Sequence, residues 1–258
     1  MRLLILGGTG EARSLAARLD EGSARRDLPG IAFTSSLAGR VSRPALPKGP
    51  VRIGGFGGIQ GLVAYLRDSA TDAVVDATHP FAAGISANAA AATSQLETPL
   101  LMLRRPGWLA GQQDNWQRVP TITAVTDLLR DQPPSRVLLT TGRRDLAVFA
   151  GLPEHHFVIR SVDPPHAGSL PPRRTLILAR GPYTVQGETE LMIEQQIDVL
   201  VTKDSGGQLT VAKLIAAREL GVAVIMVDRP PPPTDVQTVE TVEDALRWIN
   251  VQSAGPRG

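Results

Sequence analysis

The chain lacks cysteine entirely, which excludes disulfides, thiolate metal sites and cysteine nucleophiles. Only 4% of its residues are aromatic, which argues against the stacking platforms that bind single-stranded nucleic acids. Neither charge sign dominates, because 27 Lys and Arg face 25 Asp and Glu, a net charge of +2 that is too even for a general nucleic-acid binder. We therefore expect no nucleic-acid partner.

Long hydrophobic runs are also missing, and none reaches the length of a membrane span. Met1 and Arg2 run directly into an apolar strand pattern, so we expect no signal peptide, no membrane partner and a cytoplasmic location. No metal site is predicted, because supporting carboxylate spacing is absent around the histidines, which are His79, His155, His156 and His166.

A glycine cluster follows the first apolar run of the chain. Residues 3–6 have the length of a strand, the sequence Gly-Gly-Thr-Gly-Glu occupies 7–11, and helical periodicity follows. Strand, glycine turn and helix form a context that binds nucleotides, because glycine lets the backbone approach a pyrophosphate near the helix N-terminus. Arg13 stands where the third glycine of the usual pattern would be, so the helix should pack slightly differently. A tight turn without ligand is the alternative; the candidate cofactor-binding residues are Gly8, Thr9, Gly10 and Glu11.

The second predicted strand, residues 31–34, ends in hydroxyls and an arginine. NAD-binding Rossmann domains carry an acidic residue here that bonds the ribose 2′-hydroxyl. This chain offers Ser35, Ser36 and Arg40 instead, and a guanidinium suits a 2′-phosphate. The pattern favours NADPH over NADH, the alternative being an ordinary solvated arginine.

The pattern of the first half restarts after a Pro-rich linker near residue 133. Residues 136–142 resemble 2–8, residues 198–201 resemble 72–75, and residues 224–230 resemble 100–106. Residues 238–246 likewise resemble the helical segment that begins at Thr121. We predict an α/β protein of two similar Rossmann-like halves, each a parallel sheet with flanking helices, separated by an interdomain cleft. The expected domains are residues 1–132, which bind NADP, and residues 136–250, which complete the substrate cleft.

Cations and loops at the predicted strand ends supply the remaining candidates. Recurring positive charge there should attract a ligand with many negative charges. We assign substrate binding to Arg104, Arg180, Lys203, Ser205 and Gly206. Further candidate cofactor-binding residues are Thr78, His79, Gly142 and Arg143; His79 could equally cap a helix.

The loop after the buried strand at 199–201 carries a lysine and an aspartate. Lys203 and Asp204 at the mouth of a cleft could shuttle protons, and they are the candidate catalytic residues. Lys203 could instead only bind a carboxylate or the cofactor.

These loops together resemble the precorrin-6A reductase family of cobalamin (corrin ring) biosynthesis. The matching stretches are residues 7–11, 35–40, 76–82, 141–143, 179–182 and 202–207, in the family's order over nearly the whole chain. The resemblance implies NADPH-dependent reduction of precorrin-6A to precorrin-6B, with hydride to carbon C19 and a proton to C18. It implies a polycarboxylate tetrapyrrole as substrate, cobalt-free or cobalt-bound, and makes neighbouring enzymes of the corrin pathway candidate partners.

Two other functions stay open at this stage. One is an NADP-dependent reductase or epimerase of the short-chain type, but the Tyr-x-x-x-Lys pair that this class usually needs is absent after Tyr65 and Tyr183. The other is a non-catalytic two-lobed protein that binds NADP or a tetrapyrrole, which a turnover assay would distinguish.

Overall fold

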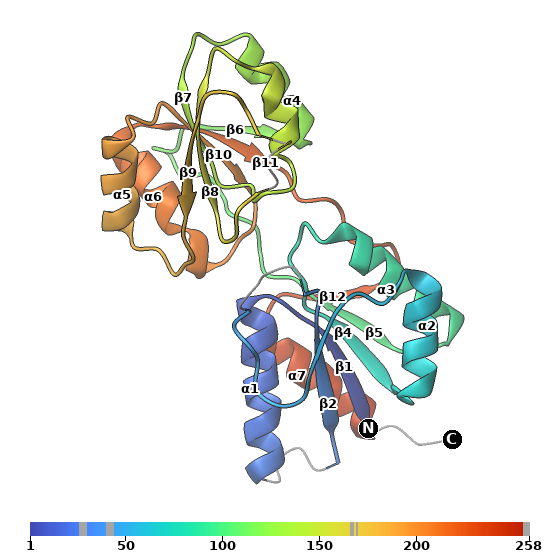
Figure 1. Ribbon diagram of the computed structural model, residues 1–258. Coiled ribbons are helices and arrows are strands. Elements are labelled where there is room, and N and C mark those ends of the chain that lie inside the picture. The colour runs from blue at the N-terminus through green and yellow to red at the C-terminus, as the bar shows by residue number, and fades with distance from the viewer. Residues whose placement is uncertain (26–29, 40–43, 166–167, 169, 255–258) are drawn as a thin grey trace. The chain divides into compact units, whose positions relative to one another are not determined.

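The computed structural model describes residues 1–25, 30–39, 44–165, 168 and 170–254, which form two compact α/β units (Figure 1). Unit 1 comprises Met1–Pro106 and Pro230–Gly258, and unit 2 comprises Gly107–Arg229. Within the described ranges, every helix is too short or too polar to span a bilayer.

Unit 1 is built on a parallel sheet with the order β12-β5-β4-β1-β2-β3. Its strands are β1 (Arg2–Leu6), β2 (Ala32–Leu37), β3 (Val51–Ile53), β4 (Ala73–Asp76), β5 (Leu100–Leu103) and β12 (Gln237–Val239). Its helices are α1 (Gly10–Arg25), α2 (Ile59–Asp68), α3 (Ala83–Gln95) and α7 (Val242–Ala254). This sheet order is that of dinucleotide-binding folds, with β1 and β4 adjacent at the point where the strand order reverses.

Both faces of this sheet are covered, which explains the continuous apolar run of β1. Leu3 and Ile5 pack in one core with residues of α1 and α7. Leu4 and Leu6 point to the other face and pack with residues of α2 and α3. Figure 1 shows α1 and α7 on one side of this sheet and α2 and α3 on the other. Burying each of these side chains is worth about 1.5–3 kcal/mol, so the strand is held from both sides.

Unit 2 repeats the same plan with the parallel order β6-β11-β10-β7-β8-β9. Its strands are β6 (Trp116–Val119), β7 (Arg136–Leu139), β8 (His156–Ser161), β9 (Arg174–Leu178), β10 (Val199–Lys203) and β11 (Ala223–Val227). Its helices are α4 (Ile122–Arg130), α5 (Val185–Glu194), α6 (Ala212–Leu220) and the 3-10 turns η1 (Leu146–Gly151) and η3 (Gln208–Thr210). The α/β class and the two Rossmann-like parallel sheets expected from the repeat are confirmed.

The division between the units differs from the predicted break at residues 132–136. The sequence pattern assigned Trp116–Val119 and the helix after it to the first half, but β6 pairs with β11 and α4 packs on β11 and β6 in unit 2. Reciprocally, β12 pairs with β5 in unit 1, where α7 packs against α1. The two halves of the repeat have exchanged their last strand and helix. Because both sheets present a similar edge and apolar face, local pattern could not tell which sheet each segment would join.

Candidate functional site

The glycine loop of unit 1 leaves β1 at the carboxyl edge of the sheet, next to β4. Gly8 is exposed, has a φ of 116°, and a Cβ placed on it would meet nothing within 4 Å. The first N–H groups of α1, which begins at Gly10, have no partner within the helix. The loop thus has open space above its backbone and donors at a positive dipole end, and it fits a dinucleotide pyrophosphate.

Thr9 and Glu11 of the same loop use their side chains to bind protein. The Thr9 hydroxyl accepts from the Ala12 N–H (3.1 Å) and donates to the Ala77 carbonyl (2.7 Å), so it caps α1 and joins the loops after β1 and β4. The Glu11 carboxylate lies 2.6 Å from a guanidinium nitrogen of Arg105. Of the predicted loop residues, Gly8 has open space over its backbone and Gly10 begins α1, while Thr9 and Glu11 use their side chains to stabilise the loop.

The predicted 2′-phosphate residues at the end of β2 have different environments. Ser35 is buried, and its Oγ has no hydrogen-bond partner within the described chain, so the hydroxyl cannot reach a ligand without movement. Ser36 projects to the other face of the sheet and accepts from Nη1 of Arg52 (3.3 Å). Arg40 lies outside the described residues.

The ends of β4 and β5 line a pocket in unit 1. Its walls include Asp76, Thr78, His79, Arg104 and the proline run 230–233. Asp76 Oδ1 accepts from the backbone N–H and the hydroxyl of Thr78, at 3.0 and 2.6 Å, and Arg104 donates to the carbonyl of Pro230 at 2.6 Å. The His79 ring accepts from the N–H of Phe81, whereas the N-cap of α3 is Ala82, so His79 is not the N-cap residue of α3.

The carboxyl edge of unit 2 carries the remaining sequence-predicted residues. Lys203 Nζ lies 2.6 Å from Asp145 Oδ2, and the N–H of Ser205 donates to the Lys203 carbonyl. Gly142 and Gly206 adopt φ values of 87° and 66° in the loops after β7 and β10. Arg143 donates to the carbonyl of Pro164 (3.5 Å), and Arg180 is exposed after β9.

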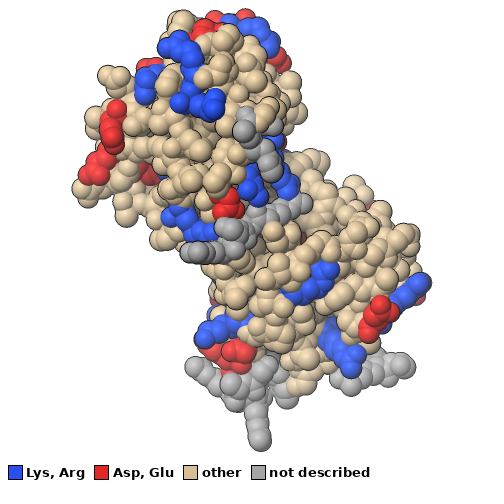
Figure 2. Space-filling model, viewed as in Figure 1, with Lys and Arg blue, Asp and Glu red and all other residues tan. Residues whose placement is uncertain are grey.

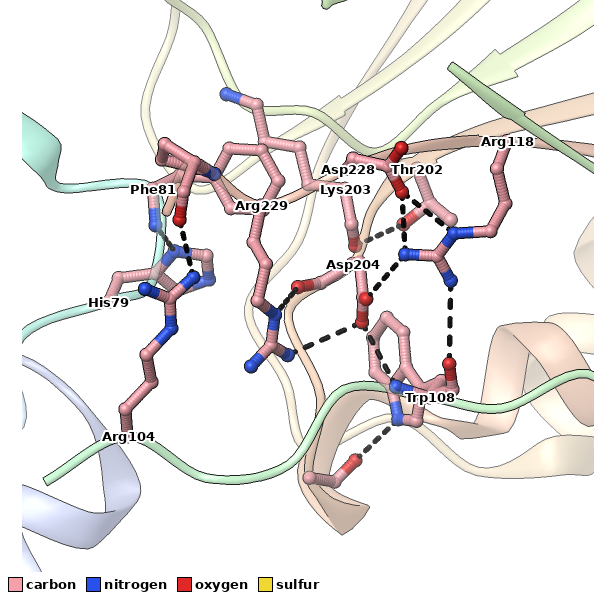
Figure 3. A network of polar contacts seen from close by, with 12 residues as sticks. His79, Phe81, Arg104, Trp108, Arg118, Thr202, Lys203, Asp204, Asp228 and Arg229 are labelled. Atoms are coloured by element: carbon pink, nitrogen blue, oxygen red, sulfur yellow. Dashed lines mark hydrogen bonds and ion pairs between the residues drawn. The ribbon is translucent and has the colours of Figure 1, made fainter. Parts of the chain in front are cut away.

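Asp204 is a buried junction in unit 2 (Figure 3). Its carboxylate accepts from Arg118 (2.8 Å), from Arg229 (3.3 Å) and from the Trp108 N–H (3.0 Å). Burial by itself would raise the pKa of Asp204, but the Arg118 hydrogen bond, the Trp108 N–H and the charge of Arg229 outweigh it and hold the pKa below its ordinary value. The carboxylate is ionised and fully engaged, so the proton-transfer role predicted for Asp204 does not fit its surroundings.

Three charged residues of these edges escaped the sequence analysis. Arg118 belongs to β6, and placing β6 in the wrong half removed it from the Asp204 loop. Asp145 lies in the loop after β7, where it pairs with Lys203, and Arg52 stands in a three-residue strand between Val51 and Ile53. Only Arg52 could have been found from its sequence neighbours, because a charged residue between two apolar strand residues, just before a run of glycines, is a candidate ligand contact.

Charges elsewhere are dispersed. On the face shown in Figure 2, basic and acidic side chains are scattered, and neither sign forms a continuous field. Among the described residues, no group of three His, Asp or Glu side chains is arranged to hold a metal ion.

Comparisons with known proteins agree over nearly the full chain. The profile of the family described as "Precorrin-6x reductase CbiJ/CobK" matches residues 2–250. A precorrin-6A reductase of Rhodococcus erythropolis is 51% identical over 248 residues, covering 96% of this chain and 97% of that protein. One from Mycobacterium tuberculosis is 48% identical over 253 residues, with 96% and 97% covered. A solved structure described as CobK precorrin-6A reductase superimposes with a TM-score of 0.89 at 43% identity, covering 100% of this chain and 99% of that one. The chain therefore belongs to the precorrin-6x reductase family, CbiJ/CobK.

Proposed function

We propose that this protein reduces precorrin-6A to precorrin-6B with NADPH, adding hydride to carbon C19 and a proton to C18. Membership of a reductase family implies a reduced nicotinamide cofactor. The observation that carries the proposal is the coincidence of this family match with an open glycine loop at the β1–β4 reversal point of unit 1.

The cofactor, when bound, would supply the hydride, and residues of unit 1 would hold it. Gly8 would leave room for the pyrophosphate, and the α1 N-terminus, which begins at Gly10, would donate N–H groups to it. Ser36, near the end of β2, and Arg40, which follows β2 in the sequence, would bind the 2′-phosphate, which a carboxylate would repel. Thr78 and His79, beside the pocket at the ends of β4 and β5, would contact the rest of the dinucleotide.

Residues of unit 2 would act on the substrate. Lys203 is the candidate proton donor, because its ammonium carries transferable protons, is partly exposed at the end of β10 and lies 2.6 Å from the carboxylate of Asp145. Arg180, Ser205 and Gly206 would bind acetate and propionate groups, and Arg104 of unit 1 is a further candidate. Asp204 would instead keep the loop after β10 in place through Arg118 and Arg229. Gly142 and Arg143 stay candidates for cofactor contacts.

The decisive experiment mixes the purified protein with NADPH and precorrin-6A and follows the loss of NADPH absorbance. We expect stoichiometric oxidation and a product heavier by one hydride and one proton. Tight binding of NADPH and precorrin-6A with no turnover would contradict the proposal and leave a non-catalytic binding protein.

A further inference from the structure

Arg52 is a fixed cation at the carboxyl ends of β2 and β3. In the parallel register it lies opposite Ser36, next to the last residue of β2. Its Nη1 donates to Ser36 Oγ (3.3 Å) and to the Gly54 carbonyl (2.5 Å), and its Nη2 donates to the Gly55 carbonyl (2.7 Å). Its guanidinium carbon lies 3.9 Å from the ring centroid of Phe56. The side chain is therefore held in one orientation before any ligand binds.

The guanidinium of Arg52 is fixed by hydrogen bonds to neutral groups, and no carboxylate of the described residues pairs with its charge. Its hydrogen-bond partners are a hydroxyl and two carbonyls, and none of the ion pairs among the described residues involves it. Arg105, Lys203 and Arg229, at other strand ends, each have a carboxylate partner. An arginine has five N–H donors, and the contacts above use three, which leaves one hydrogen on Nη2 and one on Nε.

We propose that Arg52 binds the 2′-phosphate of NADPH and is a determinant of the preference for NADPH over NADH. The inference rests on the proposed function and adds a residue that the sequence pattern did not assign. The end of β2 is where the ribose 2′ position lies in folds with this sheet order. A planar guanidinium with two remaining donors forms charge-assisted bonds to phosphate oxygens there.

A competing role is purely structural. Arg52 binds the carbonyls of Gly54 and Gly55, in a loop where Gly54, Gly57 and Gly58 all have positive φ. If it only fixes this loop, its loss should weaken every adenine nucleotide alike. If it binds the 2′-phosphate, its loss should weaken only nucleotides that carry that group.

The test measures calorimetric affinities of 2′,5′-ADP and 5′-AMP, which differ only in the 2′-phosphate, for the intact protein. We expect the wild type to prefer 2′,5′-ADP, and Arg52→Gln to lower that preference about tenfold, because the glutamine keeps a donor for the loop but loses the charge. Arg52→Lys, which keeps the charge but not the planar fork, should lose less. Circular dichroism checks that each variant is folded.

The matched control is Arg67→Gln. It removes the same charge from the last turn of α2, at the opposite end of that helix from the loop of residues 54–58 that Arg52 contacts. It should leave the preference unchanged. Equal losses for both nucleotides in Arg52→Gln, or a preference abolished by Arg40→Gln and untouched by Arg52→Gln, would overturn the assignment. A wild type that binds NADH as tightly as NADPH would instead contradict the cofactor in the proposed function.

Discussion

The ammonium of Lys203 lies 2.6 Å from the carboxylate of Asp145, and both side chains are partly exposed. The pair joins the last residue of β10 to the loop that follows β7, and these two strands are adjacent at the reversal point of unit 2. The hydrogen bond from Thr9 to the Ala77 carbonyl joins the corresponding loops of unit 1. Each unit therefore has a side-chain contact between neighbouring strand ends at its reversal point. The contact is a neutral hydrogen bond in unit 1 and an ion pair in unit 2.

Replacing Lys203 separates its two possible roles. If Lys203 stabilises charge or delivers a proton in the transition state, Lys203→Ala should lower kcat for precorrin-6A with KM little altered. If it only anchors a substrate carboxylate, KM should rise instead. Unchanged kcat and KM in Lys203→Ala would remove this residue from the site.

The open glycine loop predicts a selective loss of cofactor binding in Gly8→Ala. The φ of 116° is strained for alanine, which costs about 1–3 kcal/mol of stability, and the new Cβ would occupy the space over the loop. NADPH affinity should fall by about tenfold or more, equivalent to about 1.4 kcal/mol. The control is Gly221→Ala, which strains a left-handed residue after α6 in unit 2 and should leave affinity intact. Normal NADPH binding by Gly8→Ala in calorimetry would place the pyrophosphate elsewhere.

Asp204 should contribute acid-sensitive stability. Because its folded pKa is lowered, the contribution is complete above the unfolded carboxyl pKa of about 3.9 and is lost as the pH falls through the lower folded value. Asp204→Asn should cost about 2–3 kcal/mol at pH 7, less than a fully buried pair because Arg118 is 41% exposed. The difference in the free energy of unfolding between wild type and Asp204→Asn, measured with urea, should narrow below about pH 4.

The control for this pH dependence is Asp131→Asn, at the exposed end of α4, which should follow the wild type throughout. If the difference in the free energy of unfolding between wild type and Asp204→Asn stayed constant down to acid pH, Asp204 would not be stabilised as an anion.

Lys213 predicts a second pH dependence of stability, in neutral to alkaline solution. It is 5% exposed, donates to the Thr210 carbonyl and lies 4.9 Å from the Trp108 ring centroid. Burial, with a smaller effect of the Arg160 charge, lowers its pKa to about 7. Between pH 7 and the unfolded lysine pKa of about 10.4, the unfolded state binds more protons, so this group makes stability rise with pH.

Lys213→Met should therefore be more stable than the wild type at pH 6 to 7, and the difference should shrink toward about pH 10. Urea unfolding across this range measures it, with exposed Lys48→Met as the control. If the free energy of unfolding changed with pH in the same way for wild type and Lys213→Met, Lys213 would be charged in the folded protein.

The sequence alone determined the features that depend on neighbours along the chain. Residues 3–11 specify strand, open turn and helix, because the apolar run needs two covered faces and the turn needs glycine at a positive φ. The recurrence of the same pattern after residue 136 specified a second sheet of the same kind.

Tertiary structure decided the features that depend on which partner a segment meets. The sequences of β6 and β12 predict only a strand that pairs with a sheet edge, each followed by a helix that packs on an apolar face. Two similar sheets in this chain offer such an edge and face. The exchange brings Arg118 to Asp204, which converts a predicted proton shuttle into a buried, ionised junction. Arg52 likewise gains its fixed orientation from Ser36 and Phe56, contacts created by the parallel register and the loop before α2.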